Sequence, residues 1–335
     1  MAGQSSGKKK LLLTAEYLMK YSDEDNPVST AELIDMLEKN GISCERKSVY
    51  TDIETLSDFG LDIVKTKLGR GGWFVASRQF EDVEIRLMID AVQSASFITP
   101  AKSKKLIKNI STLCSESQMK KLSSRVYIDN RVKSDNETIY YSIDKIGRAI
   151  DSGKQIECDY AKCRTVSKLK NSACVEKHLT LNPYAMIWSA DHYYLVANNP
   201  KYDNLMHLRI DRMRNVEEIK NSSVRPFSQV SDYTDYFDVA DYSKRIFNMF
   251  SGETEDIELH CRMEILEQII DRFGDDVPLR EDFEDENMFY VRTKAAISAG
   301  LISWIMQFED NIEVISPEIL RNEIKSKAER IAGIY

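Results

Sequence analysis

The sequence predicts a multidomain α+β chain, and three observations support that prediction. The chain has 335 residues, and a usual domain size of about 100–200 residues predicts two or three domains. Hydrophobic residues make up 42% of the chain and charged residues 30%, which is typical of a soluble globular protein with real cores. Helical periodicity prevails near the N-terminus, short strand-like segments follow in the middle, and strands alternate with helices in the C-terminal quarter.

Three helices and a hairpin are predicted in residues 1–78. Ser29, with Glu32 three residues later, forms a capping box that starts the second helix. We expect Ser43 to cap the third helix and Gly60 to end it. The predicted helices are 10–21, 29–40 and 44–59, and the predicted hairpin strands are 61–66 and 73–76.

The outward face of the third predicted helix combines guanidinium, ammonium and hydroxyl groups, which are the donors that phosphates and base edges require. Three helices followed by a basic hairpin is the order of elements in a winged helix-turn-helix. A small helical domain with a solvated charged face is the alternative, because residues 1–75 hold 10 basic and 12 acidic residues. The residues expected to contact DNA are Ser29, Thr30, Arg46, Lys47, Ser48, Tyr50, Thr51, Lys65, Lys67 and Arg70.

Amphipathic helices are predicted across residues 79–140. In the first of them, from Glu81 to Phe97, we expect the apolar residues at i, i+4 spacing to face inward. These residues are Val83, Leu87, Ala91 and Ala95, with Ile85, Met88 and Ile89 widening the apolar face. Residues 101–148 are locally basic, which favours a solvated helix face and leaves extra phosphate contact in a dimer as the alternative.

A helix over residues 142–152 and six short strands are predicted between residues 141 and 225. Polar turns separate the strand segments, and several short strands at this spacing suggest a small barrel. The predicted strands are 155–161, 174–181, 185–189, 193–198, 206–209 and 216–220.

Three motifs in this middle region resemble the WYL domain. They are Asn182-Pro183-Tyr184, His192-Tyr193-Tyr194-Leu195-Val196 and Leu208-Arg209-Ile210-Asp211-Arg212. The resemblance extends to Arg46–Leu56, which is similar to the family's recognition helix. It implies a winged helix-turn-helix in 1–78, a helical linker in 79–140, an Sm-like small β-barrel in 141–225, a linker helix in 226–250 and an α+β extension domain in 251–335.

The resemblance also implies that the WYL domain senses a nucleotide or single-stranded nucleic acid. The expected ligand-binding residues are Tyr184, Tyr194, Arg209, Arg212 and Arg321. Of these, Arg321 is expected only by analogy with the family's extension, and it would reach the pocket of a neighbouring WYL domain.

The residue types in this region suit a binding groove. Arg209 and Arg212 are three residues apart and can grip one phosphate group. The alternative for Arg209 is an internal ion pair with Asp211. The two tyrosines can stack on a base or donate a hydroxyl. We expect Tyr193 to pack in the core, because it alternates with Tyr194 along one strand.

The net charge of −8 does not exclude nucleic-acid binding, because the acidity lies at the C-terminal end. Residues 251–335 hold 9 basic and 20 acidic residues, a balance of −11, and residues 1–250 have a balance of +3. We expect the acidic run 281–286 to form a solvated loop. The alternatives are that it repels DNA or docks on a basic surface of another subunit.

Four other classes of protein are not expected. The apolar stretch after Lys10 is too short for a signal peptide, and the uncharged stretch 295–308 is too short to span a membrane. No catalytic motif or phosphate-binding loop occurs, so we expect no enzyme activity and no cofactor. A zinc site is not expected either, because its candidate ligands are spaced more widely than zinc hooks usually are. These candidates are Cys158, Cys163, Cys174 and His178.

Together these features predict a cytoplasmic bacterial transcription regulator. A homodimer would bind a pseudo-palindromic, double-stranded operator DNA, and a ligand in the WYL groove would shift the geometry of the dimer. The alternative is an accessory nucleic-acid-binding protein that modulates a phage-defence effector.

Overall fold

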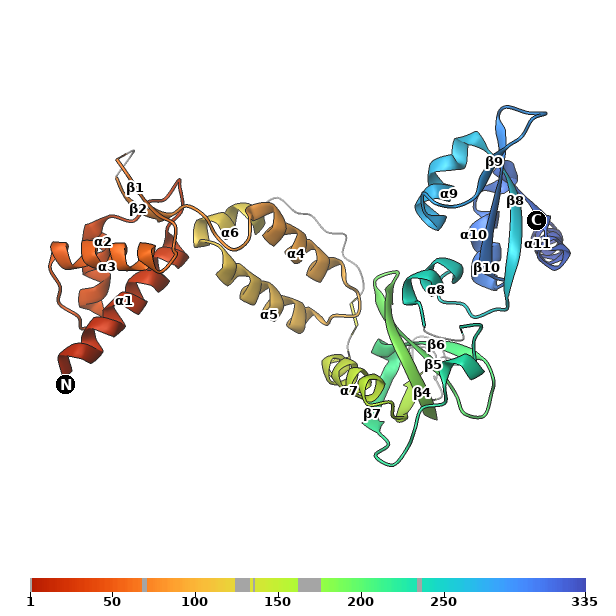
Figure 1. Cartoon of the computed structure of the whole chain (residues 1–335), viewed down its shortest axis with the longest axis horizontal. Helices are drawn as coiled ribbons and strands as arrows, with labels where there is room; N and C mark the ends of the chain where they lie inside the picture. Colours follow the sequence, from red (N-terminus) through yellow and green to blue (C-terminus); the bar gives the residue numbers. More distant parts are fainter. Residues whose placement is uncertain (1, 68–70, 124–132, 135, 162–175, 234–236) are drawn as a thin grey trace. The chain divides into compact units, whose positions relative to one another are not determined.

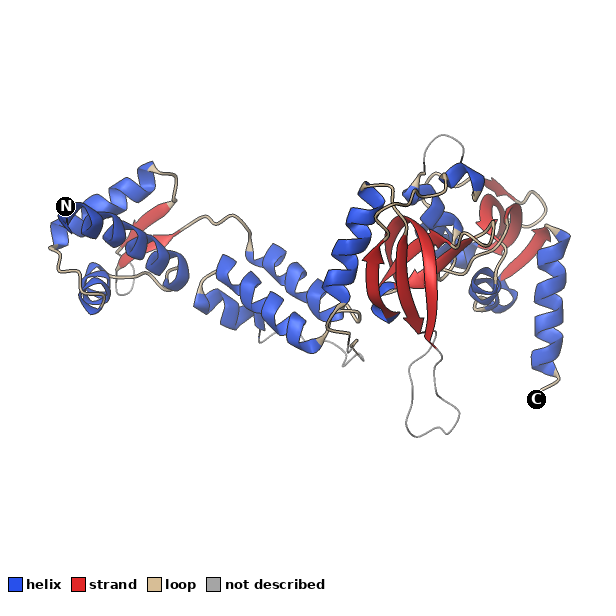
Figure 2. Ribbon diagram, turned by 90° about the horizontal axis from the view of Figure 1, so that it is seen from below, coloured by secondary structure: helices blue, strands red, loops and turns tan. Residues whose placement is uncertain are grey.

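The computed structural model describes residues 2–67, 71–123, 133–134, 136–161, 176–233 and 237–335. The chain divides into two compact units, residues 1–135 and residues 136–335 (Figure 1). Helices are found in both units, and the two larger sheets belong to the second unit (Figure 2). The predicted α+β composition of the chain is therefore confirmed.

Three helices and an antiparallel hairpin begin the first unit, in the predicted order. Leu18, Leu33 and Val49, one from each helix, pack in a shared core. The elements are α1 (Ala2–Tyr21), α2 (Thr30–Lys39), α3 (Arg46–Asp58), β1 (Ile63–Thr66) and β2 (Gly72–Val75). The capping box at Ser29 is present. The expected cap at Ser43 is wrong, because Glu45 occupies the N-cap position of α3 and makes no side-chain bond there.

The hairpin is anchored to the segment that precedes α2. The backbone N–H of Val28 donates to the carbonyl of Trp73, and the N–H of Trp73 donates back to Val28, each at 2.8 Å. Gly72 makes this approach possible, because a Cβ there would lie 2.5 Å from the Val28 carbonyl oxygen and its φ is +149°. The hairpin is thereby held against the segment before α2 and not only by its own turn.

Three further helices complete the first unit. They are α4 (Asp82–Ser94), α5 (Pro100–Ile110) and α6 (Glu116–Ser123). Ile85 and Ile89 of α4 are buried against Cys114, whereas Val83 and Leu87 are 65% and 63% exposed. The predicted inward face of α4 is therefore confirmed at Ile85 and Ile89 and wrong at Val83 and Leu87, because α5 and α6 pack on the Ile85–Ile89 side only.

The second unit begins with α7 (Ile139–Asp151) against a five-stranded antiparallel sheet. Its strands pair in the order β6-β5-β4-β3-β7. They are β3 (Ile156–Ala161), β4 (Glu176–Ser189), β5 (His192–Asn198), β6 (Leu205–Arg209) and β7 (Met213–Glu218), with a short turn of helix, η2 (Ile210–Arg212), between the last two. The sequence predicted two strands where β4 is continuous. Pro183 lies at an irregularity in its pairing with β5, which lets the strand pass a residue that has no N–H.

A second sheet of four antiparallel strands pairs in the order β11-β8-β10-β9. The elements after β7 are α8 (Val239–Arg245), β8 (Thr254–Arg262), α9 (Leu266–Phe273), β9 (Leu279–Glu281), β10 (Met288–Ala296), α10 (Ala299–Met306), β11 (Ile312–Ser316) and α11 (Glu318–Ala332). Leu259, Val291 and Leu301 lie in its core. The predicted alternation of strands and helices is present, and β9, between α9 and β10, is one further strand that was not predicted.

The linker helix α8 joins the two sheets. Tyr242 of α8 and Ile246, the C-cap residue that follows it, pack in one cluster with Ile187 and Val196 of the first sheet and Ala296 of the second. Within the described residues, no helix is both long enough and apolar enough to cross a bilayer.

Candidate functional site

The start of α3 presents several of the predicted DNA-contacting side chains. Arg46, Lys47 and Thr51 are exposed. Ser48 instead accepts a hydrogen bond from the Lys10 ammonium of α1. That ammonium also lies 3.0 Å from the largely buried carboxylate of Asp52. Lys10 therefore ties the two helices together from behind the exposed face.

A cluster of four side chains joins α2, α3 and the hairpin. The ring of Tyr50 meets Trp73 edge-on, with centroids 5.5 Å apart. The Lys65 ammonium lies 4.9 Å from the Tyr50 ring centroid and 5.0 Å from that of Trp73, which is a cation–π geometry. The indole N–H of Trp73 donates to the hydroxyl of Thr30 at 3.4 Å. We call Thr30, Tyr50, Lys65 and Trp73 the wing cluster.

The wing cluster also extends to the exposed guanidinium of α3. Hydrogen bonds with the side chains of Thr30 and Arg46 lower the pKa of Tyr50 below its ordinary value. Three predicted DNA-contacting residues are therefore held together, and Trp73, which sequence reasoning placed only in a strand, holds them. Its pairing with Val28 could not be read from local spacing, because 45 residues separate the two in the sequence.

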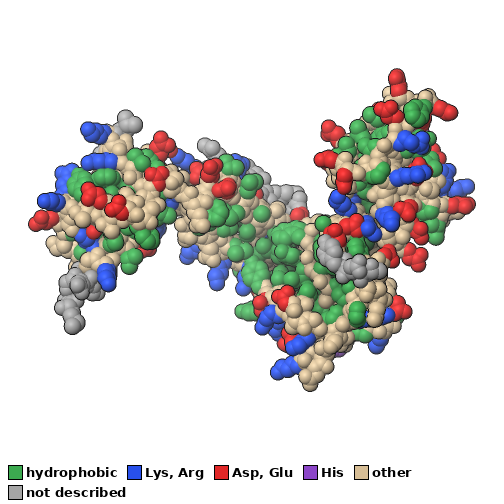
Figure 3. Space-filling model, in the orientation of Figure 1, with side chains coloured by type: hydrophobic (Ala, Val, Ile, Leu, Met, Phe, Trp, Pro, Cys, Tyr) green, Lys and Arg blue, Asp and Glu red, His purple; other side chains and the backbone are tan. Residues whose placement is uncertain are grey.

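The other predicted DNA-contacting residues are distributed as follows. The Ser29 hydroxyl is engaged in the cap of α2, Lys67 is exposed beside the hairpin, and Arg70 lies outside the described residues. Lys and Arg side chains lie among Asp and Glu side chains over this part of the chain (Figure 3). The arrangement offers a few placed cations rather than a uniform positive surface.

Arg209 and Asp211 form a two-bond ion pair in the first sheet of the second unit. Arg209 Nε donates to Asp211 Oδ1 at 3.0 Å and Arg209 Nη2 donates to Oδ2 at 2.7 Å. Burial acts against both charges, but their pairing outweighs it, so the pKa of Arg209 is raised and the pKa of Asp211 is lowered. The internal ion pair that the sequence left open is therefore what the structure contains.

Four more side chains lie near this ion pair. Tyr194 lies across the sheet from Arg209, and His192 Nδ1 is 3.9 Å from Asp211 Oδ2. Tyr160 of β3 is buried, and burial raises its pKa although the Arg209 backbone and the Arg212 side chain act to lower it. We call Tyr160, His192, Tyr194, Arg209, Asp211 and Arg212 the arginine cluster.

The electrostatics of the arginine cluster favour an anion. Burial, together with the nearby guanidinium groups of Arg209 and Arg212, lowers the pKa of His192, so its imidazole is neutral at pH 7. With a neutral imidazole, the cluster holds two guanidinium groups and one carboxylate, so its positive charge exceeds its negative charge. Sequence reasoning missed Tyr160 and His192, because their proximity depends on strand pairing: β3 places Tyr160 opposite Met213, the neighbour of Arg212.

Three other residues with sequence-based expectations lie elsewhere. The Tyr184 hydroxyl donates to the Arg225 carbonyl at 2.9 Å, its ring packs edge-on against Phe227, and burial raises its pKa to about 12. Arg321 Nη1 donates to the Val314 carbonyl at 2.6 Å. The expectation that Tyr193 packs in the core is wrong, because it is only half-buried and meets the exposed Trp188 edge-on.

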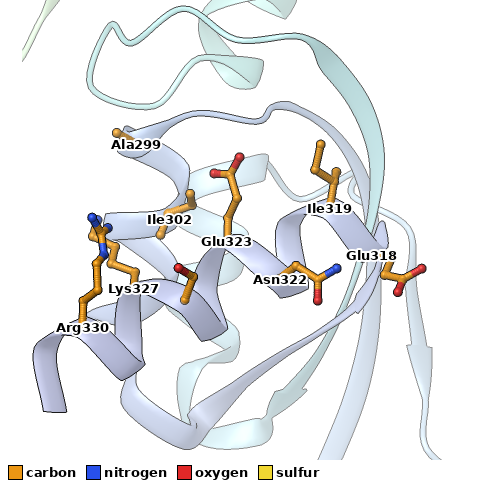
Figure 4. Close-up of a pocket in the computed structure, with 9 residues that line it drawn as sticks. Ala299, Ile302, Glu318, Ile319, Asn322, Glu323, Lys327 and Arg330 are labelled. Atoms are coloured by element: carbon orange, nitrogen blue, oxygen red, sulfur yellow. The ribbon is translucent and has the colours of Figure 1, made fainter. Parts of the chain in front are cut away.

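A separate groove of about 970 Å³ lies between α10 and α11 (Figure 4). Lys327 and Arg330 stand together at one end of it and Glu318 lies at the other. Because both acidic and basic side chains line the groove, the lining does not indicate whether a ligand would be an anion or a cation.

Metal ligands are not grouped in the part of the chain that the structure describes, where no three His, Cys, Asp or Glu residues could hold one ion. Cys163 and Cys174 lie outside that part. Burial raises the pKa of the Cys158 thiol to about 12, which disfavours the thiolate that a metal requires.

Comparison with known proteins assigns families to the second unit. The WYL domain model matches residues 142–218, which run from α7 to β7, and the WCX domain model matches residues 253–332. The uncharacterized HTH-type transcriptional regulator YobV of Bacillus subtilis (strain 168) is 21% identical over an alignment of 318 residues, which covers 92% of this chain and 94% of that protein.

Two solved structures are also similar to the chain. Proteasome accessory factor B/C (PafBC) of Arthrobacter aurescens shares 14% identity at a TM-score of 0.29, over 95% of this chain and 47% of that one, so this chain spans about half its length. A CRISPR Cas-related protein shares 14% identity at a TM-score of 0.35, over 99% of this chain and 85% of that one.

Proposed function

Because the chain belongs to the WYL-domain transcriptional regulators, we propose that it is a DNA-binding regulator that binds double-stranded operator DNA through a winged helix-turn-helix in its first unit. The observation that supports this most is the wing cluster. It holds the first turns of α2 and α3 and the strands of the hairpin at fixed spacing. Arg46, Lys47 and Thr51 remain exposed beside it.

The inner and outer sides of α3 have different roles in this proposal. Ser48 and Asp52 engage Lys10 on the inner side of α3, so the base-reading groups are the exposed ones. Arg46 can make two bonds to a guanine edge in the major groove, and Lys65 and Lys67 of the wing supply ammonium groups for phosphates.

Removal of the Arg46 side chain tests this proposal. We expect Arg46→Ala to weaken binding of a duplex recovered by selection from a random-sequence pool by about 1–3 kcal/mol, and to relax sequence preference at one position. Fluorescence anisotropy measures the affinity. Lys39→Ala is the matched control, because Lys39 is exposed on α2 and paired with Asp35, and it should leave the affinity unchanged. Equal affinities for all three proteins would contradict the role of Arg46.

The second part of the proposal is that the WYL domain, as an Sm-like small barrel, senses a nucleotide or single-stranded nucleic acid. The arginine cluster supports it, because two guanidinium groups around one carboxylate suit a phosphate. The cluster includes Tyr194, Arg209 and Arg212 of the predicted ligand site but neither Tyr184 nor Arg321.

The remaining parts of the proposal follow from this role. A homodimer in the bacterial cytoplasm would match a pseudo-palindromic operator, and the ligand would act by binding two dimer geometries with different affinities. The proposal includes no catalytic step, no metal and no cofactor. Turnover of a nucleotide by the purified chain would contradict this part of the proposal.

A further inference from the structure

Helix α5 carries charge of one sign only. It contains Lys102, Lys104, Lys105 and Lys108 and no acidic residue. Lys104, Lys105 and Lys108 are exposed, and none of these three has a carboxylate partner within the described residues. We call them the lysine row.

This arrangement weakens the helix that carries it. Lys104 and Lys108 are four residues apart, and like charges at that spacing destabilise a helix. Lys102 lies in the first turn, where the helix dipole disfavours a cation. Other helices of the chain pair a basic residue with a carboxylate four residues away, as in Lys39–Asp35, Arg86–Asp90, Arg148–Asp144 and Arg245–Asp241. A bound anion would therefore reduce the repulsion between the lysines of α5.

The charges of this helical segment are also segregated. Helix α4 and its cap carry the carboxylates Glu81, Asp82, Glu84 and Asp90 and the single cation Arg86, whereas α5 carries lysines alone. Lys and Arg side chains project along the edge that α5 forms in Figure 3. One edge of the segment is therefore suited to a polyanion.

Polar contacts, one of them buried, fix the segment to the loop between α1 and α2. The hydroxyl of Ser115, between α5 and α6, donates to the carboxylate of Asp23, and both residues are buried. Asn26 Nδ2 donates to the Ser117 hydroxyl at 2.9 Å, and Lys121 pairs with Asp25. The lysine row is therefore held in a set position relative to α3.

We propose that Lys104, Lys105 and Lys108 form a second contact with the phosphate backbone of the duplex that α3 reads. The inference rests on the proposed function and extends it: α5 contributes affinity without sequence preference. Exposed ammonium groups suit phosphates as point charges. The acidic loop 281–286 of a second copy is another anionic partner, but DNA is favoured because α5 belongs to the same compact unit as α3.

The salt dependence of binding tests this inference. The triple variant Lys104→Ala/Lys105→Ala/Lys108→Ala of the full chain is titrated against a mixed-sequence duplex of about 40 bp. Each lost phosphate contact should reduce the slope of log K against log salt by about 0.9, so we expect a reduction of about 2–3. The control is Lys201→Ala/Lys220→Ala/Lys325→Ala, which removes the same charge from exposed positions of the second unit and should leave the slope unchanged.

The outcomes separate this inference from the proposed function. An unchanged slope in the α5 variant, with binding still weakened by Arg46→Ala, overturns the inference and leaves the function standing. An unchanged slope with an altered sedimentation coefficient also overturns it, and assigns the lysine row to contact between copies. If the unaltered chain binds no duplex, the proposed function itself fails. Circular dichroism checks folding, and the triple glutamine variant replaces the alanine variant if that one does not fold.

Discussion

Trp73 and Tyr160 illustrate what single residues contribute to the two sites. Trp73 contacts Thr30, Tyr50 and Lys65, and Tyr160 lies against Arg209 and Arg212. Both contacts cross between elements that are distant in the sequence, so they depend on strand pairing and not on local spacing. The capping box at Ser29 could be predicted, because it involves residues three apart. At this scale, sequence reasoning found residues that act locally and missed those that join elements.

His207 provides a residue-scale prediction. Its Nε2 lies 2.8 Å from the Tyr242 hydroxyl and its Nδ1 lies 3.0 Å from the Ser251 hydroxyl. Burial lowers the pKa of His207 to about 4. Because the unfolded chain takes up this proton near pH 6.5, the stability that neutral His207 contributes is lost as the pH falls from about 6.5 to about 4. We expect about 2 kcal/mol of this loss between pH 7 and pH 5.

Urea denaturation of His207→Gln at both pH values measures that loss. The variant should lose less stability than the unaltered chain on acidification. His178→Gln is the control, because Asp159 raises the pKa of the exposed His178 and the stability linked to it is instead lost as the pH rises. An identical acid loss in His207→Gln and the unaltered chain would show that His207 takes up its proton equally when folded.

At the scale of elements, the sequence predicted most helices and strands but not always their orientation. In α4 two apolar stripes lie side by side, and periodicity cannot tell which of them packs. The strand β9 has three residues, too few for an alternating pattern to stand out. Strand β4 was predicted as two strands with a polar turn between them, yet an irregularity in the pairing lets the strand continue past Pro183, which has no N–H.

The orientation of α4 gives an element-scale prediction. Ile85 is fully buried and Leu87 is 63% exposed. We expect Ile85→Ala to lower the free energy of unfolding by about 2–4 kcal/mol, because it leaves a cavity against α5 and α6. Leu87→Ala should change it by less than about 0.5 kcal/mol. Urea denaturation compares the two variants, and a larger loss for Leu87→Ala would mean that the predicted stripe is the packed one.

At the scale of the whole molecule, the proposed function assigns DNA binding to the first unit and ligand sensing to the second, and the charge is divided between regions. The balance of −11 in residues 251–335 accounts for the acidity of the chain, so the proposed DNA binding would depend on local cations in the first unit. In the second unit, α8 and its C-cap residue join the two sheets through Tyr242 and Ile246. A Cβ on Gly300 would lie 2.2 Å from the Phe247 carbonyl oxygen, so the segment after α8 also lies tightly against α10. A ligand response would therefore involve both sheets.

The arginine cluster gives the prediction that separates ligand sensing from DNA binding. We expect Arg212→Ala to keep its affinity for the selected duplex and to lose the effect of an added single-stranded oligonucleotide or nucleotide on that affinity. Arg214→Ala is the control, because Arg214 is exposed two residues further along and should keep the response. If Arg212→Ala kept the full response, the arginine cluster would not be the ligand site.

The central claim is that the chain reads a DNA sequence through α3. Selection of bound duplexes from a random-sequence pool tests it most directly, with the unaltered chain and Arg46→Ala run in parallel. The account predicts that the unaltered chain enriches one pseudo-palindromic motif and that Arg46→Ala relaxes the preference at a symmetric pair of its positions. Recovery of duplexes without any common motif would contradict the claim and favour an accessory protein that binds nucleic acid without sequence preference.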